Sequence, residues 1–289
     1  MQPFDYVTPE SLEDAAALWA DAGTDAMLLA GGTDLTVGLR HGKLKTKLVI
    51  DLKRIASLGP DIKFDGDDLR VSAGTTMTQL AAYLDREALF PALQDAAAVV
   101  GSVQIRNRAT LAGNICNASP AADTVPVLAA LGAAVEIAGP SSTRIQKIVD
   151  FIQGNRKIDL QSGEIVVAVR IPMTSAAHGC AFYRITRRRG VDLATANLCC
   201  TVAKDAIVFA FGSVAPRPLV VRSSDAVLLD SDATKADRAE VIKALCAHAT
   251  PISDVRASAA YRSAMLCVMA ERALDLAKSR FLKVVNDAG

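Results

Sequence analysis

Residues 109–126, ATLAGNICNASPAADTVP, form the stretch on which the interpretation of this chain depends. It contains one acidic residue, Asp123, and no lysine or arginine. Most of the other side chains are small or carry an amide or hydroxyl group, so a ligand can come close to the backbone. The stretch therefore predicts a wall of backbone and short polar groups that faces a large, flat ligand.

Individual positions in this stretch offer different contacts to such a ligand. Hydroxyl and amide groups can donate to phosphate or sugar oxygens, and small residues leave room for close approach. The positions concerned are Thr110, Ala112, Gly113 and Asn114. Asp123 stands directly before residues 124–131, which are expected to be a helix. Its carboxylate can cap that helix or accept hydrogen bonds from ligand hydroxyls or a ring N–H group, and the two roles are compatible.

A second glycine turn occurs earlier, in LLAGGTDL, residues 28–35. Successive N–H groups at Gly31 and Gly32 can form an anion-binding nest, and Thr33 adds a hydroxyl donor. The alternative is a purely structural tight turn. The turn matches neither G-x-G-x-x-G nor G-x-x-x-x-G-K-[ST], so neither a Rossmann domain nor a P-loop is expected. Two such turns suit an elongated ligand with a charged middle, although their spacing alone does not imply a flavin.

The composition limits the class of protein. A chain of 289 residues, 51% of them hydrophobic, is long enough for two or three domains with their own cores. The net charge of +1 gives no sign of a nucleic-acid-binding protein. The six cysteines form no C-x-x-C pair and the three histidines are far apart, so no protein metal site is expected. We interpret the cysteines as small buried hydrophobic residues in a reducing compartment.

Targeting signals are not evident in the sequence. The N-terminal segment MQPFDYVTPESLEDAAALW lacks the basic start and apolar run of a signal peptide. No segment approaches the ~20 apolar residues that a membrane-spanning helix needs. The expected location is the cytoplasm, with no membrane span.

The apolar pattern predicts an α+β fold in three parts. Helical spacing in residues 8–22, followed by apolar strands at 26–30 and 47–52, indicates a small α/β subdomain. A larger α+β subdomain follows, and a small, polar run near 173–179 suggests the next boundary. The last part begins with strands and ends with two helices, which predicts a domain of antiparallel sheet and helices. The expected boundaries are 1–55, 56–173 and 178–283.

Six segments together resemble the FAD-binding, or medium, subunit of the molybdenum hydroxylase family, which includes carbon monoxide dehydrogenase-like and xanthine dehydrogenase-like enzymes. The resemblance covers residues 3 to 280. It is carried by FDYVTPESLEDAAAL, LLAGGTDL, LVIDLKRI, AGTTMTQL, QIRNRATLAGNICNASPAADTVPVLAALGA and YRITRRRGVDLATANL. The two glycine motifs in combination make the resemblance specific.

The resemblance implies FAD bound between the first two subdomains, with a C-terminal domain following. The FAD diphosphate would be wrapped by Ala30, Gly31, Gly32, Thr33, Asp34 and Leu35. A second wall would come from Thr110, Ala112, Gly113 and Asn114, and Asp123 would hold a polar part of the cofactor. Apolar contacts to the cofactor are implied for Val100 and Ile165, and a contact near the flavin ring for Arg184.

Two residues depart from the family pattern. The family has Gly-Gly before the asparagine, where this chain has Ala112 and Gly113, and the extra methyl is harmless only if the φ angle there is negative. Many members have lysine where this chain has Arg184, which keeps the charge but changes its shape. The iron–sulfur loop that some relatives carry has no cysteine cluster to support it here.

The resemblance also implies a function. A large partner subunit with the molybdopterin cofactor hydroxylates the substrate, and a small partner subunit passes electrons through two [2Fe–2S] clusters. The FAD subunit would deliver them to a soluble acceptor such as NAD or a quinone, in a hetero-oligomer that is a dimer of heterotrimers. This oxidoreductase role requires no catalytic residue in the chain, because the flavin itself carries the redox chemistry.

Alternatives remain at the level of the sequence. ITRRRG, residues 185–190, is either a solvated turn or a charged patch that faces a pyridine nucleotide or a partner subunit. The whole chain is alternatively a standalone flavin oxidoreductase with its own substrate. A third alternative is a non-catalytic scaffold that has lost FAD, and Ala112 is the residue that supports it.

Overall fold

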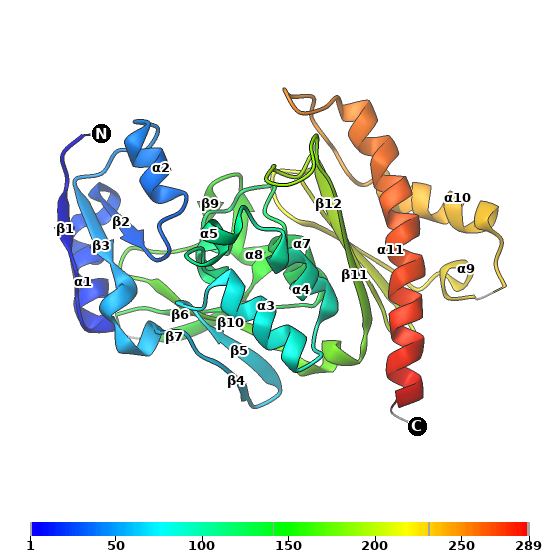
Figure 1. Cartoon of the computed structure of the whole chain (residues 1–289), viewed down its shortest axis with the longest axis horizontal. Coiled ribbons are helices and arrows are strands. Elements are labelled where there is room, and N and C mark those ends of the chain that lie inside the picture. The colour runs from blue at the N-terminus through cyan, green and yellow to red at the C-terminus, as the bar shows by residue number, and fades with distance from the viewer. Residues whose placement is uncertain (1, 141, 231, 288–289) are drawn as a thin grey trace.

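The computed structural model describes residues 2–140, 142–230 and 232–287. Figure 1 shows three units in a row, with the N-terminal unit at one end and the long C-terminal helix at the other. The middle unit joins them, so the chain passes from one end of the molecule to the other. The arrangement is the α+β fold expected from the sequence, with a two-part front half and a sheet-plus-helices end.

The N-terminal unit is a three-stranded sheet with helices packed beside it. Parallel pairing joins β1 (Asp5–Val7) to β3 (Leu48–Asp51) and β3 to β2 (Ala26–Leu29). Helix α1 (Leu12–Ala22) starts later than the expected residue 8, because its N-cap is Ser11, whose side chain accepts from the Asp14 N–H. Residues 30–34 connect β2 to helix α2 (Leu35–Arg40), so a regular element holds this loop at each end.

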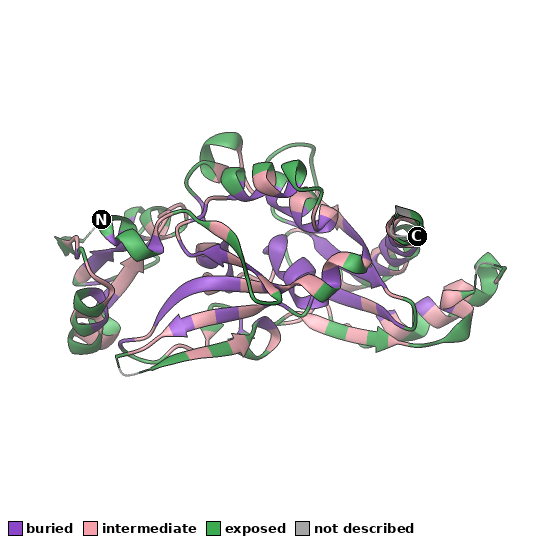
Figure 2. Ribbon diagram, turned by 90° about the horizontal axis from the view of Figure 1, so that it is seen from below, coloured by how far each residue is buried: buried purple, intermediate pink, exposed green. Residues whose placement is uncertain are grey.

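The middle unit is a five-stranded antiparallel sheet in the order β4-β5-β10-β6-β7. Helices α3, α4 and α7 pack together beside it, and the residues at this contact are buried (Figure 2). The strand bounds are β4 (Ile62–Asp65), β5 (Asp68–Ser72), β10 (Ile165–Pro172), β6 (Ala134–Ala138) and β7 (Thr143–Lys147). The helix bounds are α3 (Met77–Arg86), α4 (Pro91–Ala98), α5 (Val103–Arg106), α6 (Leu111–Cys116), α7 (Thr124–Ala130) and α8 (Ile148–Phe151). A small hairpin, β8 (Ile152–Gly154) and β9 (Lys157–Ile158), lies outside the sheet.

The C-terminal unit is a four-stranded antiparallel sheet in the order β11-β12-β13-β14. Helix α11 (Ala259–Asp287) packs on β11 and β12, and α7 of the middle unit contacts β12 and β13. The C-terminal sheet is therefore attached to the middle unit through α7. The remaining bounds are β11 (Gly179–Ile185), β12 (Ala196–Val202), β13 (Ile207–Gly212), β14 (Leu219–Ser223), α9 (Ala226–Leu229) and α10 (Lys235–Cys246).

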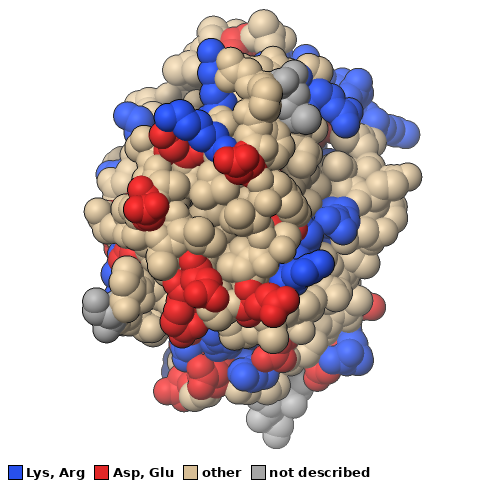
Figure 3. Space-filling view, turned by 90° about the vertical axis from the view of Figure 1, so that its left-hand side faces the viewer, with Lys and Arg blue, Asp and Glu red and all other residues tan. Residues whose placement is uncertain are grey.

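The surface carries both signs of charge. Figure 3 looks onto the N-terminal unit, where basic and acidic side chains are interspersed around an uncharged area. Within the described parts of the chain, no helix is both long enough and apolar enough to cross a membrane.

Candidate functional site

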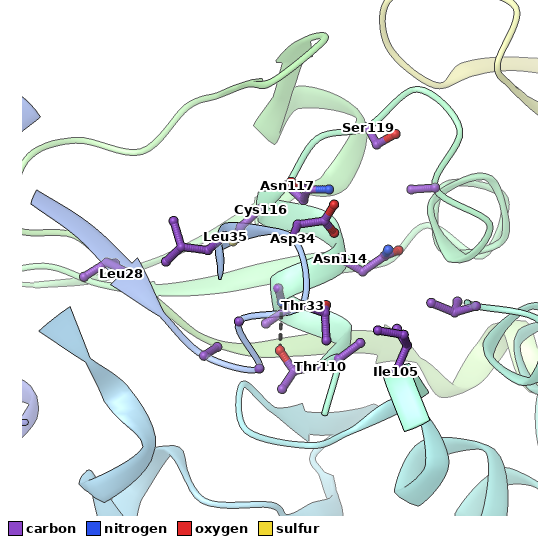
Figure 4. A pocket seen from close by; sticks show the side chains of 18 of the residues that line it. Leu28, Thr33, Asp34, Leu35, Ile105, Thr110, Asn114, Cys116, Asn117 and Ser119 are labelled. Atoms are coloured by element: carbon purple, nitrogen blue, oxygen red, sulfur yellow. Dashed lines mark hydrogen bonds between the residues drawn. The ribbon is translucent and has the colours of Figure 1, made fainter. Parts of the chain in front are cut away.

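A cavity of about 760 Å³ lies where the three units meet. Two of its walls come from the first glycine loop and from the segment around α6 (Figure 4). The loop between β11 and β12 also lines it. With the exception of Arg184, all the residues predicted to bind the cofactor line this one cavity. They are Ala30, Gly31, Gly32, Thr33, Asp34, Leu35, Val100, Thr110, Ala112, Gly113, Asn114, Asp123 and Ile165.

The first glycine loop, residues 30–34, joins β2 to α2 and presents its backbone to the cavity. Gly32 has a φ angle of 75°, which a residue with a side chain rarely adopts, and its carbonyl accepts from the Thr36 N–H at 3.0 Å. Among the described residues, the N–H groups of residues 31–34 have no protein acceptor. Four adjacent donors on a cavity wall suit a diphosphate.

Gly31 has a second reason to be glycine. A Cβ atom at Gly31 would lie 2.0 Å from the carbonyl oxygen of Arg108. Arg108 directly precedes the stretch at residues 109–126. The first glycine loop therefore packs directly against the backbone at the start of the stretch 109–126, which we call the second segment. The two predicted walls thus meet rather than diverge. The contact also means that a side chain at Gly31 would push the walls apart before it touched any ligand.

The expectation of a turn with free amides at residues 110–114 is wrong, because this segment forms the short helix α6. Thr110 caps this helix, and its hydroxyl oxygen accepts from the Gly113 N–H at 3.0 Å. The Leu111 N–H donates to the Thr75 carbonyl and the Asn114 N–H to the Thr110 carbonyl. Of residues 111–114, Ala112 alone has an N–H group with no acceptor among the described residues. The second wall therefore offers the cavity mainly side chains rather than free N–H groups.

The helix explains why alanine is tolerated at position 112. Ala112 is buried inside α6 and has no positive φ angle, so its methyl group causes no backbone strain. Asn114 has its Oδ1 atom occupied by the Thr124 hydroxyl at 2.7 Å, which leaves its Nδ2 group to donate.

Asp123 occupies the N-cap position of α7, but its side chain makes no capping hydrogen bond, so the expectation that its carboxylate caps the helix is wrong. Its Oδ2 atom pairs with Arg184 Nη1 at 2.7 Å, and its Oδ1 atom accepts from Asn197 Nδ2 at 3.0 Å. Burial raises the pKa of the Asp123 carboxyl above its ordinary value, while the charge of Arg184 and the two hydrogen bonds act in the opposite direction. Arg184 does not line the cavity and reaches it through Asp123.

The apolar positions lie on the same cavity. Ile165 is buried at the start of β10, and Val100 lies just after α4 with its carbonyl accepting from Arg106 Nη1 at 3.3 Å. Ile105 and Leu44 add apolar surface that the sequence analysis did not single out. Their side chains come from a short helix and a loop, for which hydrophobic periodicity gives no signal.

Two arginines also line the cavity. Arg156 lies at the turn between β8 and β9 with a φ angle of 59°, and it bonds to Asn117. Arg188 belongs to the ITRRRG segment, where its neighbour Arg187 pairs with Asp192 at 3.1 Å. The segment is therefore not only a solvated turn. In the described ranges no group of three or more histidine, cysteine, aspartate or glutamate side chains could hold a metal ion.

Comparison with known proteins identifies the family of this chain. Residues 2–174 match the family described as the FAD binding domain in molybdopterin dehydrogenase, and residues 181–277 match the CO dehydrogenase flavoprotein C-terminal domain. The carbon monoxide dehydrogenase medium chain of Afipia carboxidovorans is 32% identical over 96% of this chain and 97% of its own length. The xanthine dehydrogenase FAD-binding subunit of Escherichia coli O157:H7 is 30% identical over 93% and 94%.

Solved structures show the same fold. Reconstituted CO dehydrogenase from Oligotropha carboxidovorans has a chain that superposes with a TM-score of 0.87 at 32% identity, covering 96% of this chain and 99% of that one. Quinoline 2-oxidoreductase from Pseudomonas putida 86 gives a TM-score of 0.87 at 25% identity, with 97% and 99% covered.

Proposed function

The chain belongs to the FAD-binding subunits of the molybdenum hydroxylase family, and we propose that it is the electron-transfer subunit that delivers electrons through FAD to an acceptor such as NAD or a quinone. The family members are oxidoreductases, and so is the complex to which this chain contributes. Bound FAD supplies the redox chemistry, so the residues of this chain bind, orient and shield it.

The observation that carries the proposal is the row of N–H groups at residues 31–34 on a cavity wall. These donors, with the Thr33 hydroxyl and the flanking residues Ala30, Asp34 and Leu35, hold the diphosphate. A cavity of about 760 Å³ lies within the range of ligand pockets, about 300–1,000 Å³. The size and the donors both fit an elongated dinucleotide.

The other walls hold the rest of the cofactor. Thr110 keeps its hydroxyl hydrogen for donation although its oxygen caps α6, and Asn114 keeps its Nδ2 group. Asp123 accepts from a hydroxyl or a ring N–H group of FAD. Val100 and Ile165 exclude water from the apolar part. Arg184 acts on the cofactor through Asp123.

The proposed partners are a small subunit with two [2Fe–2S] clusters and a large molybdopterin subunit, assembled as a dimer of heterotrimers. Two relatives are medium chains or FAD-binding subunits by name, which supports an assembly of several different chains. Within this chain we propose boundaries at residues 1–55, 56–173 and 178–283 for the three units.

A standalone flavin oxidoreductase that acts on its own substrate is the second candidate. The scaffold alternative loses its support from the sequence, because Ala112 is accommodated within α6.

The native complex, purified by a tag on this chain, tests the proposal. We expect bound FAD, co-purifying iron and molybdenum, and reduction of the flavin by the substrate of the complex. Turnover by the isolated chain would favour the standalone enzyme. A colourless complex from cells with full flavin supply would contradict the proposal. Reoxidation of the reduced complex by NAD or by a quinone would identify the acceptor.

A further inference from the structure

Asn197 occupies an unusual environment for an amide side chain. It lies in β12, is fully buried, and has an Oδ1 atom with no hydrogen-bond partner among the described residues. A buried acceptor without a partner is costly, so a purely structural position would favour an apolar residue. Its Nδ2 group, in contrast, donates to Asp123 Oδ1 at 3.0 Å and lies 3.4 Å from the Ala122 carbonyl oxygen.

The surrounding strands are arranged around this amide. Asn197 pairs in register with Arg184 on β11, so the two side chains reach the Asp123 carboxylate from neighbouring strands. On its other side Asn197 pairs with Gly212 on β13, where a Cβ atom would lie 2.2 Å from Asn197 Oδ1. Glycine at position 212 therefore leaves the space that the amide occupies.

We propose that Asn197 is a positioning residue that, together with Arg184, fixes the Asp123 carboxylate at the cavity wall so that it accepts a hydrogen bond from FAD. The proposal rests on the proposed function and assigns to the C-terminal sheet a direct role in cofactor binding. Asn197 itself does not line the cavity, and it acts only through Asp123.

The charges around Asp123 give this role a pH dependence. Arg184 on β11 is the cation that contacts the carboxylate. The neighbouring amides of Asn197 on β12 and Asn114 on α6 are neutral. Two further charged side chains, Arg188 and Asp192, line the same cavity. Burial raises the pKa of Asp123, and the Asn197 hydrogen bond lowers it. An acceptor must be ionised to serve FAD fully, so FAD binding weakens as the pH falls through this pKa. Loss of the Asn197 donor raises the pKa and moves the weakening to higher pH.

The test measures the FAD dissociation constant of the purified full-length chain from pH 5 to 9. Asn197→Asp has the same shape but replaces the donor with a second carboxylate, and Asn197→Ala removes the donor without adding bulk. Thr201→Val is the matched control, because Thr201 is equally buried on the same strand but does not line the cavity. Thermal unfolding of the FAD-free proteins shows whether each variant is folded.

We expect both Asn197 variants to bind FAD about tenfold more weakly at pH 7, and the pH at which binding weakens to rise by about one unit. The Asn197→Asp variant should show the larger shift, and Thr201→Val should follow the wild type. Folded Asn197 variants with the wild-type pH profile of FAD binding would overturn the positioning role of Asn197 and leave the proposed function intact. An equal loss of FAD affinity in all three variants, without any pH shift, would do the same. Wild-type protein that binds no FAD at any pH would instead contradict the proposed function.

Discussion

The two segments that the sequence presents as similar glycine turns differ in how their backbone is used. In the first glycine loop, the N–H groups of residues 31–34 have no acceptor among the described residues. In the second segment, the N–H groups of Leu111, Gly113 and Asn114 are all bonded within the protein. The same small residues thus produce a donor-rich loop at one wall and a capped helix at the other. Small side chains alone therefore do not identify a backbone that can bind an anion. The feature that identifies it is a row of N–H groups without a protein acceptor.

The largest effect is expected where the two segments touch. Gly31→Ala places a methyl group 2.0 Å from the Arg108 carbonyl oxygen, so the loop and the second segment must separate. We expect a loss of about 3 kcal/mol in the free energy of unfolding, together with near-complete loss of bound FAD. Denaturant unfolding and flavin release measure both.

The matched control for this variant is Gly154→Ala, because a Cβ atom at Gly154 meets no atom within 4 Å. It should change the free energy of unfolding by less than about 0.5 kcal/mol. An unaltered Gly31→Ala protein would show that the contact between the two segments is not a tight one.

A pair of threonine variants distinguishes the two segments, because one should affect stability and the other FAD binding. Thr110→Val removes the cap of α6 and should lower the free energy of unfolding of the FAD-free chain by about 1 kcal/mol. The Thr33 hydroxyl has no protein partner in the described chain, so Thr33→Val should leave stability unchanged and weaken FAD binding about tenfold. Chemical denaturation and FAD titration of both variants check this division. The comparison fails if Thr33→Val destabilises the FAD-free chain as much as Thr110→Val does.

The smallest effect of a site substitution on FAD binding is expected at Ala112. Ala112→Gly introduces the glycine that the family resemblance leads one to expect there, and within α6 it should lower the free energy of unfolding by about 1 kcal/mol. FAD affinity should change by less than about twofold, since the methyl group strains no backbone. A large gain in FAD affinity would show that the methyl group does obstruct the cofactor.

The sequence was sufficient for features that depend on local pattern. The strand before the first glycine loop was expected at 26–30 and runs from Ala26 to Leu29, because an apolar run between turn signals is a local property. The cap of α6 could also have been found, since a threonine three residues before Gly113 has the spacing of an N-cap. Helix α3 has the same kind of local start signal, since Thr76 caps it and Gln79 completes a capping box.

Other features depend on contacts between distant residues. Asp123 meets Arg184 and Asn197 across 61 and 74 positions, and neither partner carries a local pattern that points to the other. The contact of Gly31 with Arg108 involves a backbone carbonyl, so the identity of residue 108 gives no signal at all. Arg156 lines the cavity from the turn between β8 and β9, far along the chain from the first glycine loop. Such residues are found only once the three units are assembled.

Hydrogen exchange of individual backbone amides, measured with and without FAD, tests most directly the claim that the first glycine loop holds the diphosphate. The account predicts that FAD slows exchange at residues 31–34 by a large factor and changes Leu111, Gly113 and Asn114 much less, because those amides are already bonded. Equal exchange at residues 31–34 in the two states, under conditions where FAD is bound, would contradict it.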